Sequence, residues 1–342
     1  MTIDKIIGQL LIMMTIAIIG FIYAKLTKVS ETEQKFLSKM LLYFINPCLI
    51  FSHFNIDFEK SRFVGLCISI VVSFLVTFLF ILLAECIFRK KVPLSKLQKI
   101  GIVFTNCGFI GIPLIEGVAG GEGVFYLMGY LVAFNVMLWV YGYYQMTQKF
   151  NLIKIITNPN VLAVLLGITV YVLPFKVPEA IAKPVALIGG TNTAMSMILL
   201  GVLFGALKKE WMIKLFNTFK SFFNQNPEFK EQRKKIGTLL FTAFVRLCLC
   251  SLFSLVLCGF IYFSIVKLFP SWDLTSIKLV ITVIYIASLC PTGMSVSSMA
   301  CLFDGDTVFS NFLVCFTHAL CLVSIPLFFA FFNIFLKLLG IE

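Results

Sequence analysis

The chain has 342 residues, of which 60% are hydrophobic and only 13% are charged. Its mean hydropathy of +1.00 lies outside the range of soluble globular proteins and predicts an all-α integral membrane protein. The net charge of +12 would favour a nucleic-acid partner in a soluble protein. Here the lysines and arginines fall almost wholly in short loops between apolar runs, so they predict orientation in a lipid bilayer and no nucleic-acid partner.

The apolar runs predict ten membrane-spanning helices, because each run is long enough to cross about 30 Å of hydrocarbon. They cover residues 6–24, 37–54, 63–88, 97–119, 124–146, 161–175, 180–206, 237–268, 277–302 and 307–338. The first run could be a signal peptide. A single preceding lysine and the lack of a small-residue cleavage site before Lys25 favour a retained span instead.

The loop charges predict which way the chain crosses the membrane. Nineteen of the 28 lysines and arginines lie in the first, third, fifth and seventh loops, against eight in the other loops and the tails. The positive-inside rule then places both termini outside the cytoplasm, and the plasma membrane is the expected location. The longest loop, 207–236, would be cytoplasmic. Its aromatic residues among lysines suit either an amphipathic segment on an anionic leaflet or an unstructured basic loop.

A short internal similarity predicts two repeats. The stretch GEGVF at 121–125 follows span four, and GDTVF at 305–309 follows span nine. Five is an odd number of crossings. Two five-span repeats, 1–157 and 158–342, would therefore lie in opposite orientations in the membrane.

Spans four and nine carry residues that disfavour a helix. These residues are Asn106, Gly108, Gly111, Pro113, Pro291, Thr292 and Gly293. Either interruption alone fits an ordinary proline kink. The pair favours two broken helices that meet near the midplane, where helix N-termini, each carrying about half a positive charge, can hold an anion without a lysine.

Ionisable residues are absent from the middle of spans four and nine. Glu85, Glu116 and Arg246 lie toward span ends, where we expect them to reach the membrane interface. Amides, hydroxyls and helix ends are thus expected to meet the charge of a substrate. Sodium held by carbonyl and hydroxyl oxygens is as compatible with this composition as uniport, and no buried central carboxylate is a candidate for shuttling protons.

The sequence carries no signature of a catalytic or metal site. All eleven cysteines lie in apolar segments and none forms a C-x-x-C pair, which disfavours a disulfide framework or a zinc site. There is no H-E-x-x-H, P-loop or nucleophile elbow. We therefore expect no enzyme activity, no catalytic residue and no cofactor.

Several segments, in order along nearly the whole chain, resemble the auxin efflux carrier family, which includes plant PIN-type auxin carriers and bacterial organic-acid permeases. NPCLIFSHF at 46–54, TNCGFIGIPL at 105–114 and NVMLW at 135–139 resemble its second, fourth and fifth spans. NPNVLAVLLG at 158–167, GGTNTAMSMILLG at 189–201 and CPTGM at 290–294 resemble its sixth, seventh and ninth. Two departures favour a bacterial-type permease over a plant carrier. Thr105 stands where the plant carriers have a proline, and the long loop follows span seven instead of span five.

The resemblance implies a sodium/proton antiporter-like and bile-acid-transporter-like fold, with inverted five-helix repeats, crossing broken helices four and nine, and a homodimer. Spans 1, 2, 6 and 7 would form a scaffold, and spans 3–5 and 8–10 a transport part that moves against it like an elevator. The substrate site implied by position contains Asn46, Asn106, Asn135, Thr191, Asn192, Pro291 and Thr292. Gly293 at the second break is also predicted to belong to this site.

The expected function is secondary active or facilitative transport of a small organic anion. The anion would be a mono- or dicarboxylate of the malate or malonate type, or an auxin-like carboxylate. In this hypothesis Asn106 donates to the carboxylate, Gly108 and Gly111 let the backbone approach it, and Pro113 fixes the break. The alternative is a ligand-sensing membrane protein that uses a transporter fold for regulation and signals through 207–236. A channel also stays open.

Overall fold

The computed structural model describes residues 3–89, 93–149, 153, 157–173, 177–205, 230–269 and 273–339, and it contains helices but no strands over these ranges. Short π-helical turns, labelled η, interrupt or join the α-helices, and four of them lie in the described ranges. In chain order the elements are α1 (Ile3–Thr27), α2 (Glu31–Met40), η1 (Leu41–Ile45), α3 (Asn46–Phe54), α4 (Lys60–Ile87), α5 (Pro93–Val103), η2 (Cys107–Gly111), α6 (Ile112–Met137), η3 (Leu138–Gly142), α7 (Tyr143–Thr147), α9 (Pro159–Val172), α10 (Glu179–Gly190), α11 (Asn192–Gly205), α13 (Lys230–Phe244), η5 (Val245–Leu249), α14 (Cys250–Leu268), α15 (Leu274–Leu289), α16 (Met294–Leu302) and α17 (Thr307–Leu338).

The helices are those of a multi-pass integral membrane protein. Within the described ranges, seven helical runs are long and apolar enough to span a membrane, and α9 and α15 are shorter apolar helices. Large apolar side chains such as Leu11 and Ile19 are more than half exposed on the surface, where lipid would cover them. The count of ten spans and their arrangement as inverted repeats remain predictions.

The predicted boundary between spans four and five is a kink and not a loop. Helix α6 continues through the expected gap at 120–123, and only Gly120 leaves the helical conformation, with φ of 65°. This left-handed backbone is strained for residues with a side chain, so glycine fits it best. The predicted start of span eight at residue 237 is also late, because α13 already begins at Lys230. Residues 207–229 of the basic loop lie outside the described residues.

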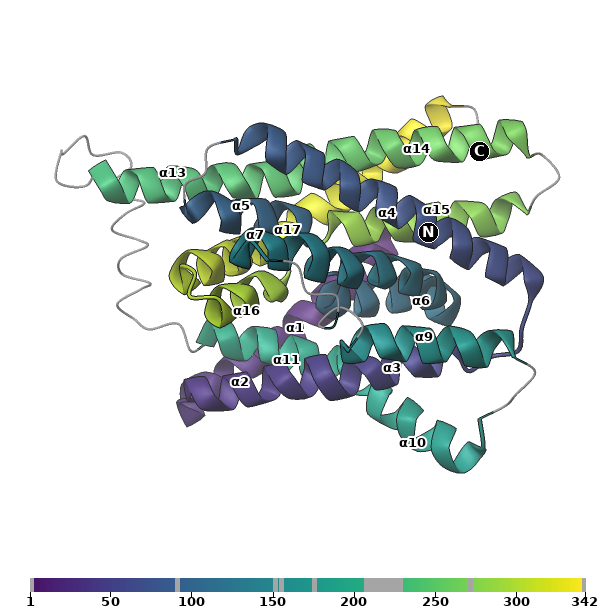
Figure 1. Cartoon of the computed structure of the whole chain (residues 1–342), viewed down its shortest axis with the longest axis horizontal. Helices are drawn as coiled ribbons and strands as arrows, with labels where there is room; N and C mark the ends of the chain where they lie inside the picture. The colour runs from purple at the N-terminus through teal and green to yellow at the C-terminus, as the bar shows by residue number, and fades with distance from the viewer. Residues whose placement is uncertain are drawn as a thin grey trace.

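The most extensive helix contacts gather in two groups of helices (Figure 1), and α6 of the second group also contacts α1, α3 and α9 of the first. In the first group α1 packs along α11, and α3 packs against α9 and α10. Close contact between α1 and α11 depends on Gly20 and Gly201, because a side chain on either would collide with the backbone of the other helix. The second group is built around α6 and α15, which contact each other and α4. All residues from 280 to 289 are buried, as expected for a segment in which Thr282 and Ser288 interrupt an otherwise apolar or aromatic run.

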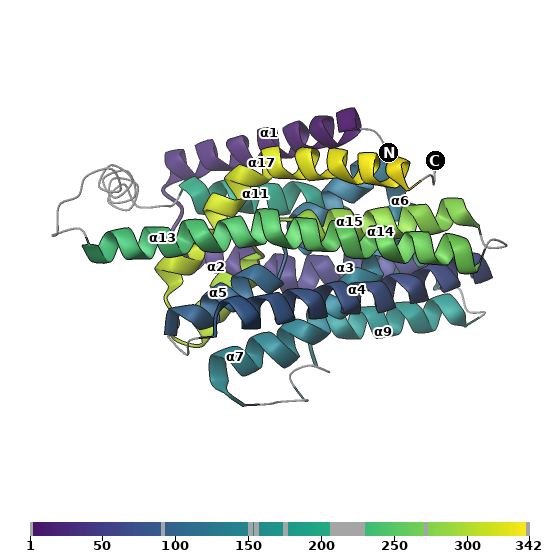
Figure 2. The ribbon, with the colours of Figure 1, turned by 90° about the horizontal axis from the view of Figure 1, so that it is seen from above.

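The two ends of the described chain lie close together at one end of the molecule (Figure 2). Helices α1 and α17 run side by side there and are in contact. An even number of crossings requires both termini on one side of the membrane. The side on which they lie remains a prediction.

Candidate functional site

The two interrupted helices meet at their breaks. Helix α5 ends at Val103 and α15 ends at Leu289, and the extended residues that follow pair as an isolated antiparallel bridge between Thr105 and Thr292. The backbone N–H of Asn106 donates to Pro291 O at 2.8 Å, and the N–H of Gly293 donates to Phe104 O at 2.8 Å. Backbone groups that each break frees from a helix are therefore satisfied by the other break, which removes the cost of leaving them unpaired in a membrane.

Neighbouring helices hold the second break in place. The Thr292 hydroxyl donates to Gly101 O at 2.9 Å, and the Thr292 N–H donates to the Thr317 hydroxyl at 3.2 Å. A methyl group on Gly293 would lie 2.8 Å from Thr105 O and 3.2 Å from Phe104 O. Glycine is thus required at position 293 because the two broken segments approach each other closely. Its backbone angles do not require glycine, since its φ is an ordinary −67°.

The expectation that the Arg246 side chain reaches the membrane interface is wrong. Arg246 is fully buried in η5, where its side chain reaches carbonyl oxygens at both breaks. Its Nε and Nη2 donate to Cys290 O at 3.2 and 3.0 Å, its Nη1 donates to Ile102 O at 2.9 Å, and its Nη2 also donates to Ser288 O. A buried cation therefore lies at the junction of the two breaks.

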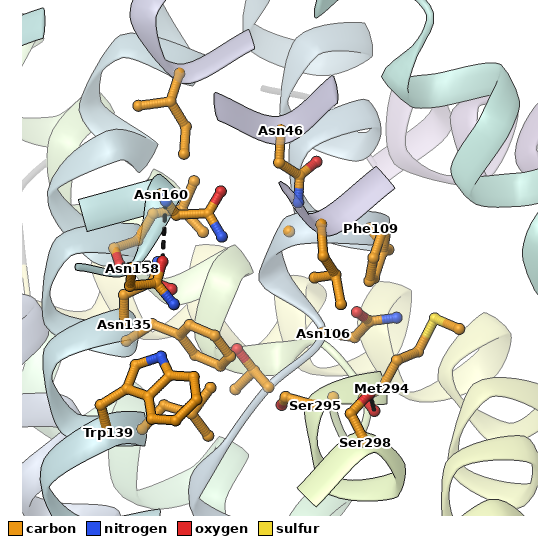
Figure 3. Close-up of a pocket in the computed structure, with 18 of the residues that line it drawn as sticks. Asn46, Asn106, Phe109, Asn135, Trp139, Asn158, Asn160, Met294, Ser295 and Ser298 are labelled. Carbon is orange, nitrogen blue, oxygen red and sulfur yellow. Dashed lines mark hydrogen bonds between the residues drawn. The ribbon is translucent and has the colours of Figure 1, made fainter. Parts of the chain in front are cut away.

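The place where the two breaks pair, residues 104–106 with residues 291–293, is called the crossing. A cavity of about 90 Å³ opens beside it (Figure 3). Such a volume holds several water-sized groups. Residues from both groups of helices line it: Leu42, Tyr43, Asn46, Ile50, Thr105, Asn106, Gly108, Phe109, Ile112, Leu131, Phe134, Asn135, Leu138, Trp139, Asn158, Asn160, Gly293, Met294, Ser295, Ser298 and Met299. None of the lining residues is charged, so its polarity comes from amides, hydroxyls and the backbone.

Hydrogen bonds fix how three of the five lining asparagines face the cavity. Asn158 is the N-cap of α9, and its Oδ1 accepts from the N–H groups of Asn160 at 2.9 Å and Val161 at 3.4 Å. Its Nδ2 remains to face the cavity as a donor (Figure 3). Asn135 donates from Nδ2 to Leu131 O at 2.8 Å, which leaves its oxygen as an acceptor.

Asn106 is tied to α17 by His318. The Nδ1 of His318 lies 2.7 Å from Val314 O, and the Nε2 lies 2.7 Å from Asn106 Nδ2. A carbonyl oxygen only accepts, so Nδ1 carries the proton and Nε2 accepts from the Asn106 amide. The Asn106 oxygen then lies toward the cavity (Figure 3), and one of the two amide hydrogens is already used. The expectation that Asn106 supplies the main donor to a carboxylate fits this geometry less well than a donor role for Asn158.

Four buried polar atoms of the cavity wall have no partner within the described part of the chain. They are Asn46 Oδ1, Trp139 Nε1, Asn160 Oδ1 and Ser295 Oγ. An unsatisfied buried donor or acceptor costs about 1–3 kcal/mol. Such a group of orphaned atoms around one cavity indicates a place where water or a polar ligand binds.

Three helix N-termini converge on the cavity. The π-helical turn η2 begins directly after Asn106, α9 begins after Asn158, and α16 begins after Gly293. All three of these cap residues line the cavity. Since each helix N-terminus carries about half a positive charge, the cavity is electropositive without a lysine or arginine in its wall.

The structure brings five of the eleven predicted site residues to the cavity, namely Asn46, Asn106, Gly108, Asn135 and Gly293. Pro291 and Thr292 lie in the crossing itself. Gly111 and Pro113 lie beyond the break, in the helical run where η2 continues directly into α6, and the Pro113 carbonyl accepts from Gln9.

Thr191 and Asn192 lie away from the cavity, at the joint between α10 and α11. The Thr191 side chain is exposed and donates to Ile188 O at 2.7 Å, while Asn192 is buried. Whether any of the predicted residues binds substrate remains a prediction.

Sequence reasoning missed Asn158, Asn160, Trp139, Ser295 and His318 as parts of the site. The N-P-N signature held the first signal, since asparagine followed by proline is typical of a helix start, and a helix start beside a break can face a ligand. His318 is different. It lies 212 residues from Asn106, and no local pattern indicates that they meet.

Comparison with known families agrees with this architecture. A family model described as membrane transport protein matches residues 5–151 and 144–329, which is nearly the whole chain. A search of curated proteins found no sequence that matches this chain. Members of the matched family are transporters and not enzymes. The chain therefore belongs to the membrane transport protein family, the family of the auxin efflux carriers and PIN-like proteins.

Proposed function

We propose that the protein is a secondary carrier that binds a small organic anion, a mono- or dicarboxylate, in the cavity beside the crossing. The observation that supports this most directly is the convergence of three helix N-termini on an uncharged cavity with orphaned polar atoms. Helix N-termini favour negative charge, and donors such as Trp139 Nε1 and Asn158 Nδ2 are free to meet carboxylate oxygens.

The cavity wall also suits the carbon skeleton of such an anion. Tyr43, Phe109, Phe134 and Trp139 provide an aromatic lining, and the small volume favours a compact ligand. The acceptor oxygens of Asn106 and Asn135 would bind a hydroxyl or N–H group on the same molecule. A compact carboxylate with one such donor matches the wall better than a simple fatty acid.

We also propose an elevator mechanism, and the position of the cavity supports it. Asn46 and Asn158 come from the group of helices that contains α3 and α9, whereas Asn106 and Ser295 adjoin the crossing. In the proposed mechanism the crossing moves against the first group and carries the anion with it. The close packing of α1 against α11 at Gly20 and Gly201 supports a rigid pairing of these two helices.

Variants of Asn158 test the proposal after a thermal-shift screen of the purified protein against malate, malonate and indole carboxylates has found a ligand. Asn158→Asp keeps an N-cap acceptor but turns a carboxylate toward the cavity. Asn158→Ser keeps the cap and removes the amide donor without adding charge. We expect the dissociation constant to rise about tenfold for serine and about a hundredfold or more for aspartate.

Asn158→Ala is the matched control for helix capping. It should lower the free energy of unfolding by about 1 kcal/mol, whereas serine and aspartate should leave it nearly unchanged. Equal anion affinity in the wild-type protein and the aspartate variant would refute the proposed site.

Counter-flow exchange in proteoliposomes separates transport from sensing. A carrier shows saturable uptake of labelled ligand that is accelerated by unlabelled ligand on the opposite side. Ligand binding without any uptake, coupled to a change in the protease sensitivity of residues 207–236, would favour the sensing alternative instead.

A further inference from the structure

Arg246 stands apart from the other charged side chains of the described chain because it is fully buried at the centre of the crossing. Its guanidinium group forms four hydrogen bonds to three carbonyl oxygens, those of Ile102, Ser288 and Cys290. No ion pair within the described ranges includes it, and the ring of Phe80 lies 5.0 Å from the guanidinium carbon. The thiol of Cys250 is a further hydrogen-bonding neighbour.

These carbonyls belong to the C-terminal ends of two broken helices. Ile102 lies in the last turn of α5, Ser288 lies in the last turn of α15, and Cys290 follows that turn. Carbonyls in a last helical turn lack helical partners, and each helix C-terminus carries about half a negative charge. One guanidinium group therefore balances two helix ends without a carboxylate.

Carbonyl oxygens at helix C-termini inside a membrane are the ligands that a dissolved monovalent cation would use. At this crossing the carbonyl oxygens instead bind the guanidinium group of Arg246, a cation that is part of the protein. Arg246 and the three carbonyl-bearing residues do not line the cavity, but Thr105 and Gly293, which do, follow Ile102 and Cys290 by only three residues. Arg246 thus holds the segments that form part of the cavity wall, although it does not itself contact the cavity.

We propose that Arg246 is a tethered cation that fills a monovalent-cation site formed by the ends of α5 and α15. The two breaks then stay joined and neutralised without an ion from solution. The cation site itself does not depend on the carrier function. Only one consequence rests on that proposed function, namely that anion binding needs no dissolved sodium.

The test compares thermal unfolding of the purified full-length protein in chloride salts of sodium, guanidinium and N-methylglucamine at equal, non-denaturing ionic strength. For the wild type we expect less than about 1 °C between the salts. Arg246→Ala should unfold at a lower temperature in N-methylglucamine and regain at least about 3 °C, saturably, with sodium or guanidinium, because the vacated carbonyls bind the added ion. A purely structural arginine would show no such recovery.

Two further variants keep the test decisive if the alanine variant does not fold. Arg246→Lys retains the charge and should be insensitive to sodium, whereas Arg246→Gln loses the charge and should be stabilised by it. Arg62→Ala controls for loss of an arginine elsewhere, since Arg62 pairs with Glu59 at 3.3 Å and is partly exposed. Saturable stabilisation of the wild type by sodium, or cation-insensitive alanine and glutamine variants, would overturn the proposal. Because no substrate is used, failure of the carrier function would leave this result unaffected.

Discussion

The two polar regions of the crossing, the amide-lined cavity and the Arg246 site, solve the problem of buried polarity in opposite ways. Around Arg246 a full positive charge is buried, yet four hydrogen bonds to carbonyl oxygens account for it. The cavity contains no charge, yet four of its polar atoms lack a partner in the described chain. A polar group that the chain satisfies by itself stabilises the fold, whereas one left unsatisfied is available to a ligand.

This contrast depends on the backbone bridge between the two regions. The bridge joins the helix ends whose carbonyls bind Arg246, on the N-terminal side of each break, to the helix N-termini that face the cavity on the C-terminal side. Changes that separate the breaks should damage both regions. Changes in the wall of the cavity should affect ligand binding alone.

Gly293→Ala should have the largest effect on stability. Its methyl group would meet Thr105 O at 2.8 Å, and relief of that contact would break the hydrogen bond from the Gly293 N–H to Phe104 O. We expect a loss of about 2–3 kcal/mol in the free energy of unfolding, together with loss of ligand binding. Chemical unfolding in detergent micelles measures the first effect.

Gly108→Ala is the matched control. The nearest atom outside its own turn, Asn46 Nδ2, would lie 3.9 Å from the new methyl group, which is ordinary contact. Alanine favours helical conformations, so stability should be unchanged or higher by about 0.5 kcal/mol, while anion affinity falls because the methyl group enters the cavity. Equal stability of the two alanine variants would contradict the role given to the bridge.

Thr317→Val should have the next largest effect. Valine has nearly the same shape, but it leaves the buried N–H of Thr292 without its acceptor. An expected loss of about 1–2 kcal/mol in unfolding free energy follows. Thr15→Val should be neutral by comparison, because the Thr15 hydroxyl is exposed and donates only to Leu11 O in its own helix. Similar losses for both variants would show that the second break does not depend on Thr317.

His318→Leu should weaken ligand binding about tenfold, which corresponds to about 1.4 kcal/mol. The leucine removes the acceptor for Asn106 Nδ2, so the amide can turn and no longer presents a fixed oxygen to the cavity. His318→Gln can supply an amide oxygen in place of Nε2 and should recover part of the affinity. Isothermal titration with the ligand from the screen measures the series, and unchanged affinity in the leucine variant would remove His318 from the account.

Asp306→Ala should have the smallest effect and sets the scale for ordinary capping away from both regions. Asp306 is the N-cap of α17, where its side chain accepts from Phe309 N at 2.9 Å. We expect a loss of about 1 kcal/mol in unfolding free energy without any change in anion affinity. A change in affinity comparable to that of the Asn158 variants would indicate that general destabilisation explains the cavity results.

The sequence predicted the interruptions of spans four and nine, which follow α5 and α15, because glycine, proline and asparagine change local backbone preferences. It placed Pro113 at the break, but the break lies at Phe104–Asn106 and Pro113 lies inside the helical run that begins at Cys107. The long Cys107–Thr147 run was expected to contain a loop, because sequence patterns do not distinguish a single left-handed glycine at Gly120 from a connection.

The polar partners were harder to predict than the breaks. Hydropathy locates Arg246 along a span but says nothing of the carbonyls that satisfy it, which come from residues 42 to 144 positions away. Asn158 was noticed only as part of a family signature, although its capping role could have been inferred from the proline that follows. His318 meets Asn106 through tertiary packing alone.

A density map of the protein with the carboxylate that most raises its unfolding temperature tests the central claim most directly. We predict density for the anion in the cavity, with carboxylate oxygens within hydrogen-bonding distance of Asn158 Nδ2 and the N-terminus of α16, and with Arg246 still bound to the carbonyls of Ile102 and Cys290. An empty cavity with the anion bound elsewhere, or an anion paired directly with Arg246, would contradict the account.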